Sequence, residues 1–518
     1  MKRFNKMLAM ALAFLVCLSV STVALAAVPT GQTITPGQPD SDGKYTISVK
    51  SDDTHTYTVY QILTGSLIPG ETKLGNPVWG ADAKGGDGNK VEDFIASITA
   101  PNLSNAQISD LVKAQLKDDA QGQGTVSADH PVKVVPGYYL LVDTTAELDE
   151  GDSYSLNIIA VFNNIEINPK KGTTESDKKV DDNDADKAAD GSEWIDSADY
   201  SIGDTVPYKL SATVAEDYAN YTKGYKLTFH DKMSNGLTFN PGSVVVKIDG
   251  TKITDGFNLV TEPGDGCTFE VHFDNLRTIE AVHARSVITV EFNATLNESA
   301  VIGSEGNPNT SHVTFTNNPN DNQAGENGKT PDDTVIVFTY KTVFNKVDKD
   351  KKALNGADFK LEKKVEDQWV DVTQLHTGEG AKNPTKSGDT TGSEFVFAGL
   401  DAGDYRLTET TTPSGYNTIA PIEFTITAEH QVLSNDPKLT SLAGTDGHEF
   451  VMTMEKQKIE GADEQPTGVL LANIVNNQGS ELPSTGGMGT TLLYTIGGVL
   501  VAVSAIGLIA RRKMSAEQ

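Results

Sequence analysis

Cysteine is nearly absent from this sequence, with two residues among 518. Cys17 lies in an apolar N-terminal run that has the form of a secretory leader, so the mature chain keeps Cys267 alone. Exported proteins built of small domains often depend on disulfides, but a chain with one cysteine forms none internally. We therefore expect another device to stiffen the domains.

Positive charge is also scarce. Lysine and arginine together number 42, against 71 aspartates and glutamates, and the formal net charge is −29. The cations of the leader and of the extreme C-terminus leave with those segments, so the mature chain is more acidic still. Such a surface argues against nucleic acid or anionic lipid as a partner.

Catalytic and metal-binding motifs are missing. There is no HExxH, no GxSxG and no DxSxS, and Gly328-Lys329-Thr330 lacks the first glycine of a P-loop. Asp182 to Glu193 has carboxylates at EF-hand spacing, but Lys187 replaces the turn glycine, which favours a solvated loop over a calcium site. We expect no enzyme, no metal and no cofactor; a secreted glycosidase or protease is the disfavoured alternative.

Long apolar runs occur only at the two ends. Lys2, Arg3 and Lys6 precede the apolar run Met7–Leu25, and Ala24-Leu25-Ala26 is typical of a cleavage site. Residues 1–26 are therefore predicted to be a signal peptide.

The second apolar run, 491–510, has roughly the 20 residues that cross a ~30 Å hydrocarbon core, and Arg511-Arg512-Lys513 follows it. The pentapeptide Leu482-Pro483-Ser484-Thr485-Gly486 precedes it. The order of motif, span and basic tail over 481–518 resembles the cell-wall sorting signal of Gram-positive surface proteins, which a sortase cleaves between Thr485 and Gly486. The chain is expected to be secreted and attached covalently to peptidoglycan.

Between the ends, apolar patterning predicts three units. Residues 27–168 contain strand-like Tyr57–Leu63 and Gly137–Val142, with helical spacing at 91–98 and 108–112. This combination predicts an α+β domain.

The two later units read as all-β. In 169–340, Ile288 to Leu296 alternates apolar and polar residues, and Val244–Ile248 and Val335–Tyr340 are further strand candidates. In 341–480, alternating pairs such as Phe395/Phe397 recur. We predict a mainly β fold, with tandem immunoglobulin-like β-sandwiches after the α+β domain and a C-terminal transmembrane helix.

The third unit resembles the collagen-adhesin B-type repeat. The resemblance rests on Asn345-Lys346-Val347-Asp348, Leu354–Phe359 and the box Tyr405–Tyr416 around Glu409. It implies a covalent bond from Lys346 to an asparagine on the last strand, assisted by Glu409. Asn476 is the expected partner, with Asn473 and Asn477 as alternatives.

Such a bond needs these residue types. Burial depresses the pKa of a lysine and raises that of a carboxyl group, so the amine becomes nucleophilic and the acid can shuttle protons. Ammonia leaves and an isopeptide remains. The reaction occurs once per molecule.

The middle unit resembles the corresponding domain of backbone pilins. The matching segments are 202–207, 231–239, 303–309 and 316–320. The resemblance implies a bond from Lys178 (or Lys179) to Asn317 (or Asn318), with Asp231 as the acid.

Backbone pilins also carry a lysine between their first two domains, which a pilin-specific sortase joins to the next subunit. Ile165-Glu166-Ile167-Asn168-Pro169-Lys170 falls at that place, with Lys171 as the alternate. A bond from Thr485 to Lys170 of another copy would build an open fibre.

These resemblances predict the shaft subunit of a pilus, or fimbrium. Its expected partners are pilin-specific and housekeeping sortases, other copies of itself, other pilins and peptidoglycan; no host ligand is indicated. The alternatives are a monomeric wall-anchored adhesin and a minor pilin.

Overall fold

The computed structural model describes 38–68, 74–85, 90–100, 103, 105–167, 172–182, 194–319, 325, 328–373, 392–447, 450–458 and 464–479. The signal peptide, Lys170, Lys171, the sorting motif and the span 491–510 lie outside these ranges. Within the described ranges, no helix has the length and apolar character needed to cross a membrane.

The first domain consists of two small sheets and two helices. Strands of the larger sheet bury side chains on both faces, one against the smaller sheet and the other against the helices. The sheet orders are β5-β1-β8 and β3-β2-β6-β7, with β4 also pairing β2. The elements are β1 (Tyr45–Val49), β2 (Tyr57–Leu67), β3 (Leu74–Trp79), α2 (Val91–Ile98), α3 (Asn105–Lys113), β4 (Thr125–Val126), β5 (Val132–Val134), β6 (Gly137–Asp143), β7 (Leu156–Val161) and β8 (Ile165–Ile167).

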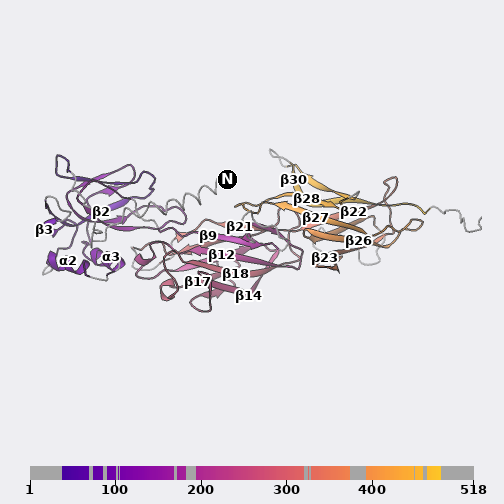
Figure 1. Cartoon of the computed structure of the whole chain (residues 1–518), viewed down its shortest axis with the longest axis horizontal. Helices are drawn as coiled ribbons and strands as arrows, with labels where there is room; N and C mark the ends of the chain where they lie inside the picture. Colours follow the sequence, from indigo (N-terminus) through magenta and orange to yellow (C-terminus); the bar gives the residue numbers. More distant parts are fainter. Residues whose placement is uncertain are drawn as a thin grey trace, which may run out of the picture. The chain divides into compact units, whose positions relative to one another are not determined.

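Side-chain alternation along β6 explains this layering. Tyr139 and Leu141 point into the core between the two sheets, whereas Leu140 belongs to the cluster formed with the helices. Val91, Phe94 and Ile98 are the buried residues of α2, and Figure 1 shows α2 and α3 together on one side of the domain. The predicted α+β domain with these two helices is confirmed.

The middle domain is a sandwich of two sheets. The first sheet has the order β10-β9-β12-β18-β14-β15, and the second β11-β21-β19-β13-β17-β16, with β20 pairing β19. The strands are β9 (Ser176–Asp181), β10 (Trp194–Ile195), β11 (Ser197–Asp199), β12 (Thr205–Thr213), β13 (Leu227–Met233), β14 (Leu237–Ile248), β15 (Thr251–Ile253), β16 (Asn258–Val260), β17 (Phe269–Phe273), β18 (Val287–Leu296), β19 (Asn307–Phe315), β20 (Gly328–Lys329) and β21 (Asp333–Phe338).

Period-2 alternation builds the core of this sandwich. On β18 every second residue from Ile288 to Leu296 is buried, as the sequence pattern predicts, and the same alternation holds on β12. One strand prediction is corrected: 335–340 is not continuous, because β21 ends at Phe338 and the next strand begins at Tyr340. Thr339 between them is fully buried, and its carbonyl accepts a hydrogen bond from Gly303.

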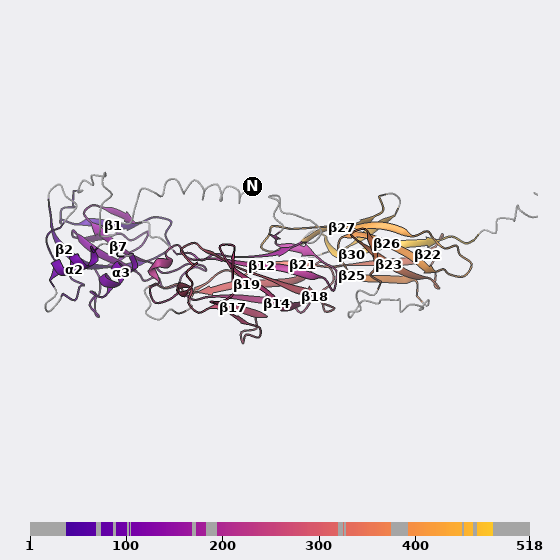
Figure 2. The same cartoon turned by 60° about the horizontal axis from the view of Figure 1, so that its bottom comes forward.

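The third domain is all-β, and its strands form one continuous nine-stranded sheet in the order β24-β23-β26-β27-β28-β29-β30-β22-β25. Its strands are β22 (Tyr340–Asp348), β23 (Asp358–Val365), β24 (Gln368–Asp371), β25 (Glu394–Leu400), β26 (Gly403–Thr411), β27 (Ile422–His430), β28 (Leu439–Thr445), β29 (Val451–Gln457) and β30 (Gln465–Asn476). Figure 2 shows β22, β26 and β30 in this domain. The mainly β fold class is confirmed.

The chain divides into two compact units. One comprises Met1–Tyr340 with Gly399–Asp401 and Ala428–Ser441, and the other holds the rest of the chain from Lys341. The proposed boundary between 168 and 169 lies outside the described residues.

Candidate functional site

The third domain carries its buried lysine on the first strand and its buried asparagine on the last. β22 and β30 run parallel, with Lys346 opposite Ile474 and Asp348 opposite Asn476. Side chains alternate between the two faces of a strand, and this phase turns Lys346 and Asn476 inward. Both are fully buried.

Glu409 on β26 completes this cluster. The Lys346 Nζ donates to Asn476 Oδ1 and lies 3.3 Å from Glu409 Oε1. The Asn476 Nδ2 donates to the same Oε1 at 2.8 Å. The other carboxyl oxygen accepts from the Ile419 backbone N–H at 3.0 Å. A single oxygen of Glu409 therefore faces both the attacking and the leaving nitrogen of an amide exchange.

Burial also favours the neutral, nucleophilic form of the Lys346 amine. It lowers the pKa of Lys346, and the carboxyl group of Glu409 opposes this shift without cancelling it. The Lys346 Nζ lies 5.5 Å from the centroid of the Phe359 ring, an apolar surface that cannot replace lost hydration. A neutral amine at this position has a free lone pair for the Asn476 carbonyl carbon.

The alternative asparagines of β30 do not reach this cluster. Asn473 and Asn477 are exposed, whereas Asn476 shares the inward phase of Ala472 and Ile474. Of the three candidates, the structure brings only Asn476 to Lys346 and Glu409.

The middle domain holds a second cluster of the same type, made across its two sheets. Lys178 lies on β9 of one sheet and Asp231 on β13 of the other, and both are fully buried. The Lys178 Nζ donates to Asp231 Oδ2. It lies 5.6 Å from the ring centroids of both Tyr208 and Phe292, so the lysine sits among aromatic rings.

The pKa shifts in this cluster favour the neutral forms of both partners. Burial lowers the pKa of Lys178, although Asp231 opposes the shift. Burial likewise raises the pKa of Asp231 against the opposing effects of Lys178 and Asn309. A buried neutral amine beside a buried protonated acid is the starting state that the bond-forming chemistry requires.

Lys179 is a poor alternative. Burial acts to lower its pKa, but hydrogen bonds from its Nζ to Asp177 and Asp196, at 2.6 and 2.7 Å, outweigh that effect and raise the pKa. Lys179 is therefore held as a cation. The structure favours Lys178.

The structure places Asn309, and not the predicted Asn317, beside the acid of this cluster. Asn309 is opposite Met233 in the β13–β19 ladder, two residues from Asp231. It is fully buried, its amide lies beside Asp231, and neither of its polar atoms has another hydrogen-bond partner among the described residues. Sequence reasoning missed it, although Asn309 ends a segment that carries the pilin resemblance.

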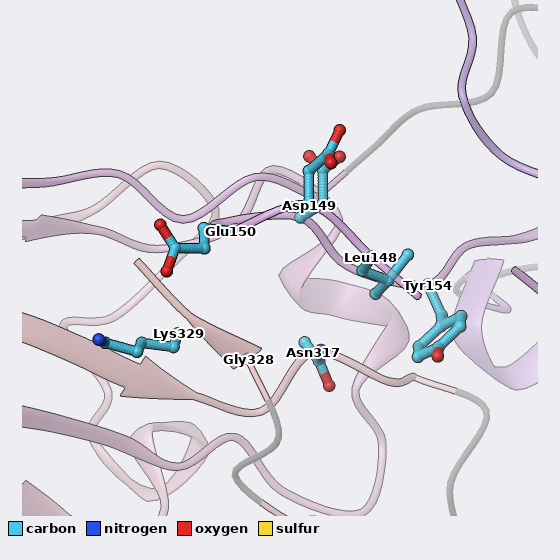
Figure 3. Close-up of a pocket in the computed structure, with 8 residues that line it drawn as sticks. Leu148, Asp149, Glu150, Tyr154, Asn317, Gly328 and Lys329 are labelled. Carbon is cyan, nitrogen blue, oxygen red and sulfur yellow. The ribbon is translucent and has the colours of Figure 1, made fainter. Parts of the chain in front are cut away.

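Asn317 lies beyond the end of β19, away from Lys178. Its carbonyl accepts from the Tyr154 backbone N–H at 2.8 Å, and its side chain lines a pocket with Leu148 and Gly328 (Figure 3). Asn318 follows it at the same end. β19 ends at Phe315, roughly 20 Å along the strand from Asn309 at ~3.3 Å per residue, and both asparagines lie beyond that end.

The remaining predicted site residues lie outside the described residues. They are Lys170, its alternate Lys171, and the sortase motif Leu482, Pro483, Ser484, Thr485 and Gly486. The described chain reaches Ile167 on one side of the lysines and resumes at Gly172 on the other.

Three family models match separate parts of the chain. A model described as Gram-positive pilin backbone subunit 2, Cna-B-like domain, matches residues 202–319. A prealbumin-like fold domain named SpaA matches 341–438, and the LPXTG cell wall anchor motif matches 474–515. These are models of structural pilin domains and of a cell-wall anchor, not of enzymes.

A known streptococcal surface protein is similar to this chain in sequence. The trypsin-resistant surface T6 protein of Streptococcus pyogenes serotype M6 is 27% identical over 375 residues, covering 60% of this chain and 65% of its own length. This chain thus matches slightly less than two thirds of that relative.

One solved pilin structure shares the fold, and a second aligns more weakly. The T6 backbone pilin of serotype M6 Streptococcus pyogenes, with a modular three-domain structure, aligns with a TM-score of 0.50 at 17% identity, covering 85% of this chain and 100% of that one. The major pilin SpaD of Corynebacterium diphtheriae aligns with a TM-score of 0.43 at 17% identity, over 84% and 98%.

Proposed function

We propose that this chain, which is built from the domains of Gram-positive backbone pilins and ends in an LPXTG anchor, is the shaft subunit of a covalently polymerised pilus on the cell wall. The observation that carries the proposal is the pair of buried lysine–acid–asparagine clusters. In each cluster, a covalent bond between the lysine and the asparagine would connect strands that are distant in the sequence of one domain.

Lys346 and Asn476 supply the first bond. The neutral Nζ attacks the Asn476 side-chain carbonyl carbon, and Glu409 takes a proton from the attacking nitrogen and delivers one to the departing Nδ2. The bond from carbon to Nδ2 breaks, ammonia leaves, and an amide joins β22 to β30. The geometry supports this route, since one Glu409 oxygen lies 3.3 Å from Nζ and 2.8 Å from Nδ2.

Lys178 and Asn309 supply the second bond, with Asp231 in the role of Glu409. The product joins β9 to β19 and so ties one sheet of the sandwich to the other. Each reaction occurs once per chain, within the folded chain itself and without turnover. The chain therefore does not act as an enzyme.

Polymerisation uses two further residues. A pilin-specific sortase cleaves after Thr485 and transfers its carbonyl to the amine of Lys170 on another copy, with Lys171 as the alternate. A housekeeping sortase attaches the last subunit to peptidoglycan, and other pilins join through the same chemistry. The position of Lys170, three residues after β8 ends at Ile167, supports this assignment.

The test is a wall extract from cells expressing Lys170→Ala, and Lys170→Ala with Lys171→Ala. We expect the ladder of multimers that survives denaturing electrophoresis to disappear while monomer stays in the wall fraction. Lys179→Ala, which removes a cation from the following strand, is the matched control and should keep the ladder. A ladder that persists in the double variant contradicts the assignment of Lys170 and Lys171 as acceptors, whereas the absence of any ladder from the parent contradicts the polymer and favours a monomeric wall-anchored adhesin.

A further inference from the structure

We propose that His230, Asp265, Cys267 and Glu270 form a binding site for a zinc-class divalent cation on the outer face of the middle domain. Their ligand atoms, one per residue, all lie within 4.8 Å of one another. This set includes nitrogen, sulfur and oxygen donors, and it contains the sole cysteine of the mature chain.

The β-ladder and one turn bring these residues together. His230 on β13 is directly opposite Glu270 on β17, so the two side chains emerge on the same face of the sheet. Asp231 follows His230 and therefore points to the opposite, buried face. Asp265 and Cys267 lie in the turn that precedes β17, where the Cys267 backbone N–H donates to Asp265 Oδ1 at 2.9 Å.

The spacing of the donors fits a tetrahedral ion. Donors held about 2.1 Å from zinc at the corners of a tetrahedron are about 3.4 Å apart. The His230 Nδ1 lies 2.8 Å from Glu270 Oε1 and 3.2 Å from Asp265 Oδ2. The Cys267 Sγ lies 3.3 Å from the same oxygen of Asp265. Small movements of these side chains would bring the donor atoms to the separations required around one zinc ion.

A second layer of contacts orients the ligands. The His230 Nε2 is 3.0 Å from Thr314 Oγ1, which can accept a hydrogen bond from the Nε2–H and leave the lone pair of Nδ1 directed at the cluster. The His272 Nε2 is 2.6 Å from Glu270 Oε2, leaving Oε1 toward His230. Metal-binding histidines and carboxylates are typically held by such outer partners.

His312 adds packing without being a ligand. It is opposite His230 in the β13–β19 ladder, and the two rings stack with centroids 4.7 Å apart. Its Nδ1 faces Asp332 at 3.2 Å, so its own polar atom is directed elsewhere. The stack limits rotation of the His230 ring.

The donor types select the ion. Calcium and magnesium prefer oxygen ligands, whereas a thiolate, an imidazole and two carboxylates suit zinc. Four protein ligands leave no open position, which is typical of structural rather than catalytic zinc. The bound ion would fasten the 265–267 turn to β13 and protect the thiol of an exported protein from oxidation.

Equilibrium dialysis of the chelator-treated mature chain against zinc chloride tests the site. We expect one zinc per chain, with affinity falling at least about tenfold in both Cys267→Ser and His230→Gln. His283→Gln is the matched control, because His283 is an exposed histidine of the same domain outside the cluster. The same variants measured with calcium chloride separate a mixed-donor site from generic attraction to acidic groups.

Cobalt substitution and thiol labelling give readouts that do not depend on affinity. Cobalt should produce a sulfur-to-metal charge-transfer band that Cys267→Ser abolishes, and zinc should slow alkylation of Cys267. The proposal is overturned by no stoichiometric zinc, by zinc binding that both variants leave unchanged, or by calcium binding as tightly as zinc. Melting temperatures of the zinc-free variants show that each remains folded.

Discussion

A lysine ammonium is fully hydrated in the unfolded chain, and both Lys346 and Lys178 lose that hydration on folding. Desolvation penalises the charged form, which is why the pKa of each falls. Conversion of the amine into an amide would remove the ionisable group from the core altogether. At this scale the proposed isopeptide bond would remove the cost of burying an ionisable amine.

The identity of the asparagine in the middle domain is a residue-scale prediction. Asn309→Ala should leave the mature chain heavier by one ammonia than the parent mass corrected for the Asn-to-Ala change, because that bond no longer forms. Asn317→Ala should show the mass change of the substitution alone, because its side chain lies away from Lys178. Intact-mass spectrometry with peptide mapping distinguishes them. The reverse pattern would restore Asn317.

Asp217 makes the stability of the middle domain depend on pH. Burial raises its pKa from 3.8 to about 7, so between these values the folded chain holds a proton that the unfolded chain has released. Stability from this group therefore falls as pH rises through the window. Asp217→Asn should match the parent near pH 4 and be more stable near pH 8, by up to ~4 kcal/mol from the size of the shift.

Thermal unfolding across this pH range measures the difference. Glu216→Gln is the neighbouring control, since the exposed Glu216 pairs with Arg285 at the surface, and its difference from the parent should stay small. A difference between Asp217→Asn and the parent that does not change with pH would contradict the assignment.

At the scale of elements, the position of each crosslink matters more than its chemistry. Lys346 and Asn476 are 130 positions apart in sequence, and the proposed bond between them would join the first strand of the third domain to its last. The proposed bond between Lys178 and Asn309 would join strands in opposite sheets of the middle domain. Each link would therefore close most of a domain into one covalent loop, which restricts the unfolded chain.

Asn476→Ala should destabilise the third domain strongly. Loop-closure entropy for a crosslink over ~100 residues is about 4–5 kcal/mol by analogy with disulfides. Guanidinium unfolding should show an earlier transition for this variant. The control is Asn473→Ala on the same strand, where the side chain is exposed, and its transition should stay near the parent. Equal midpoints for the two variants would refute the crosslink.

At the scale of the whole molecule, the proposed joints are asymmetric. Lys170 and Thr485 lie far apart in sequence and differ in chemistry, so each subunit uses one surface as acceptor and another as donor. A heterologous contact of this kind does not close on itself and extends as a fibre. The acidic chain, with a formal net charge of −29, also favours dispersed fibres because like charges repel.

A tagged chain carrying both Lys170→Ala and Lys171→Ala, produced together with the untagged parent, tests this polarity. The variant keeps Thr485 and can donate, but it cannot accept another subunit, so it should occupy one end of each fibre. Immunogold electron microscopy should show one label per fibre, whereas a tagged parent chain labels the whole length. Labels of the variant along the shaft would contradict the assignment of Lys170.

The sequence alone determined the mainly β class, and its family resemblances indicated Lys346, Glu409 and Asp231 while leaving Lys178 and Lys179 open. Local alternation predicted β18, and helical spacing predicted α2 and α3, because both periods are properties of neighbouring residues. The box around Glu409 and the order of motif, span and basic tail were likewise contiguous patterns.

Tertiary structure decided which residues meet. Asn309 and Asn317 share one phase of the same segment, so alternation cannot choose between them; the pairing of β19 with β13 places Asn309 near Asp231. The sequence offered a lone cysteine and scattered histidines, and only the pairing of β13 with β17 sets His230 beside Glu270. The physical reason is the same in both cases: side-chain phase is set within a strand, whereas neighbours across strands depend on contacts between distant parts of the chain.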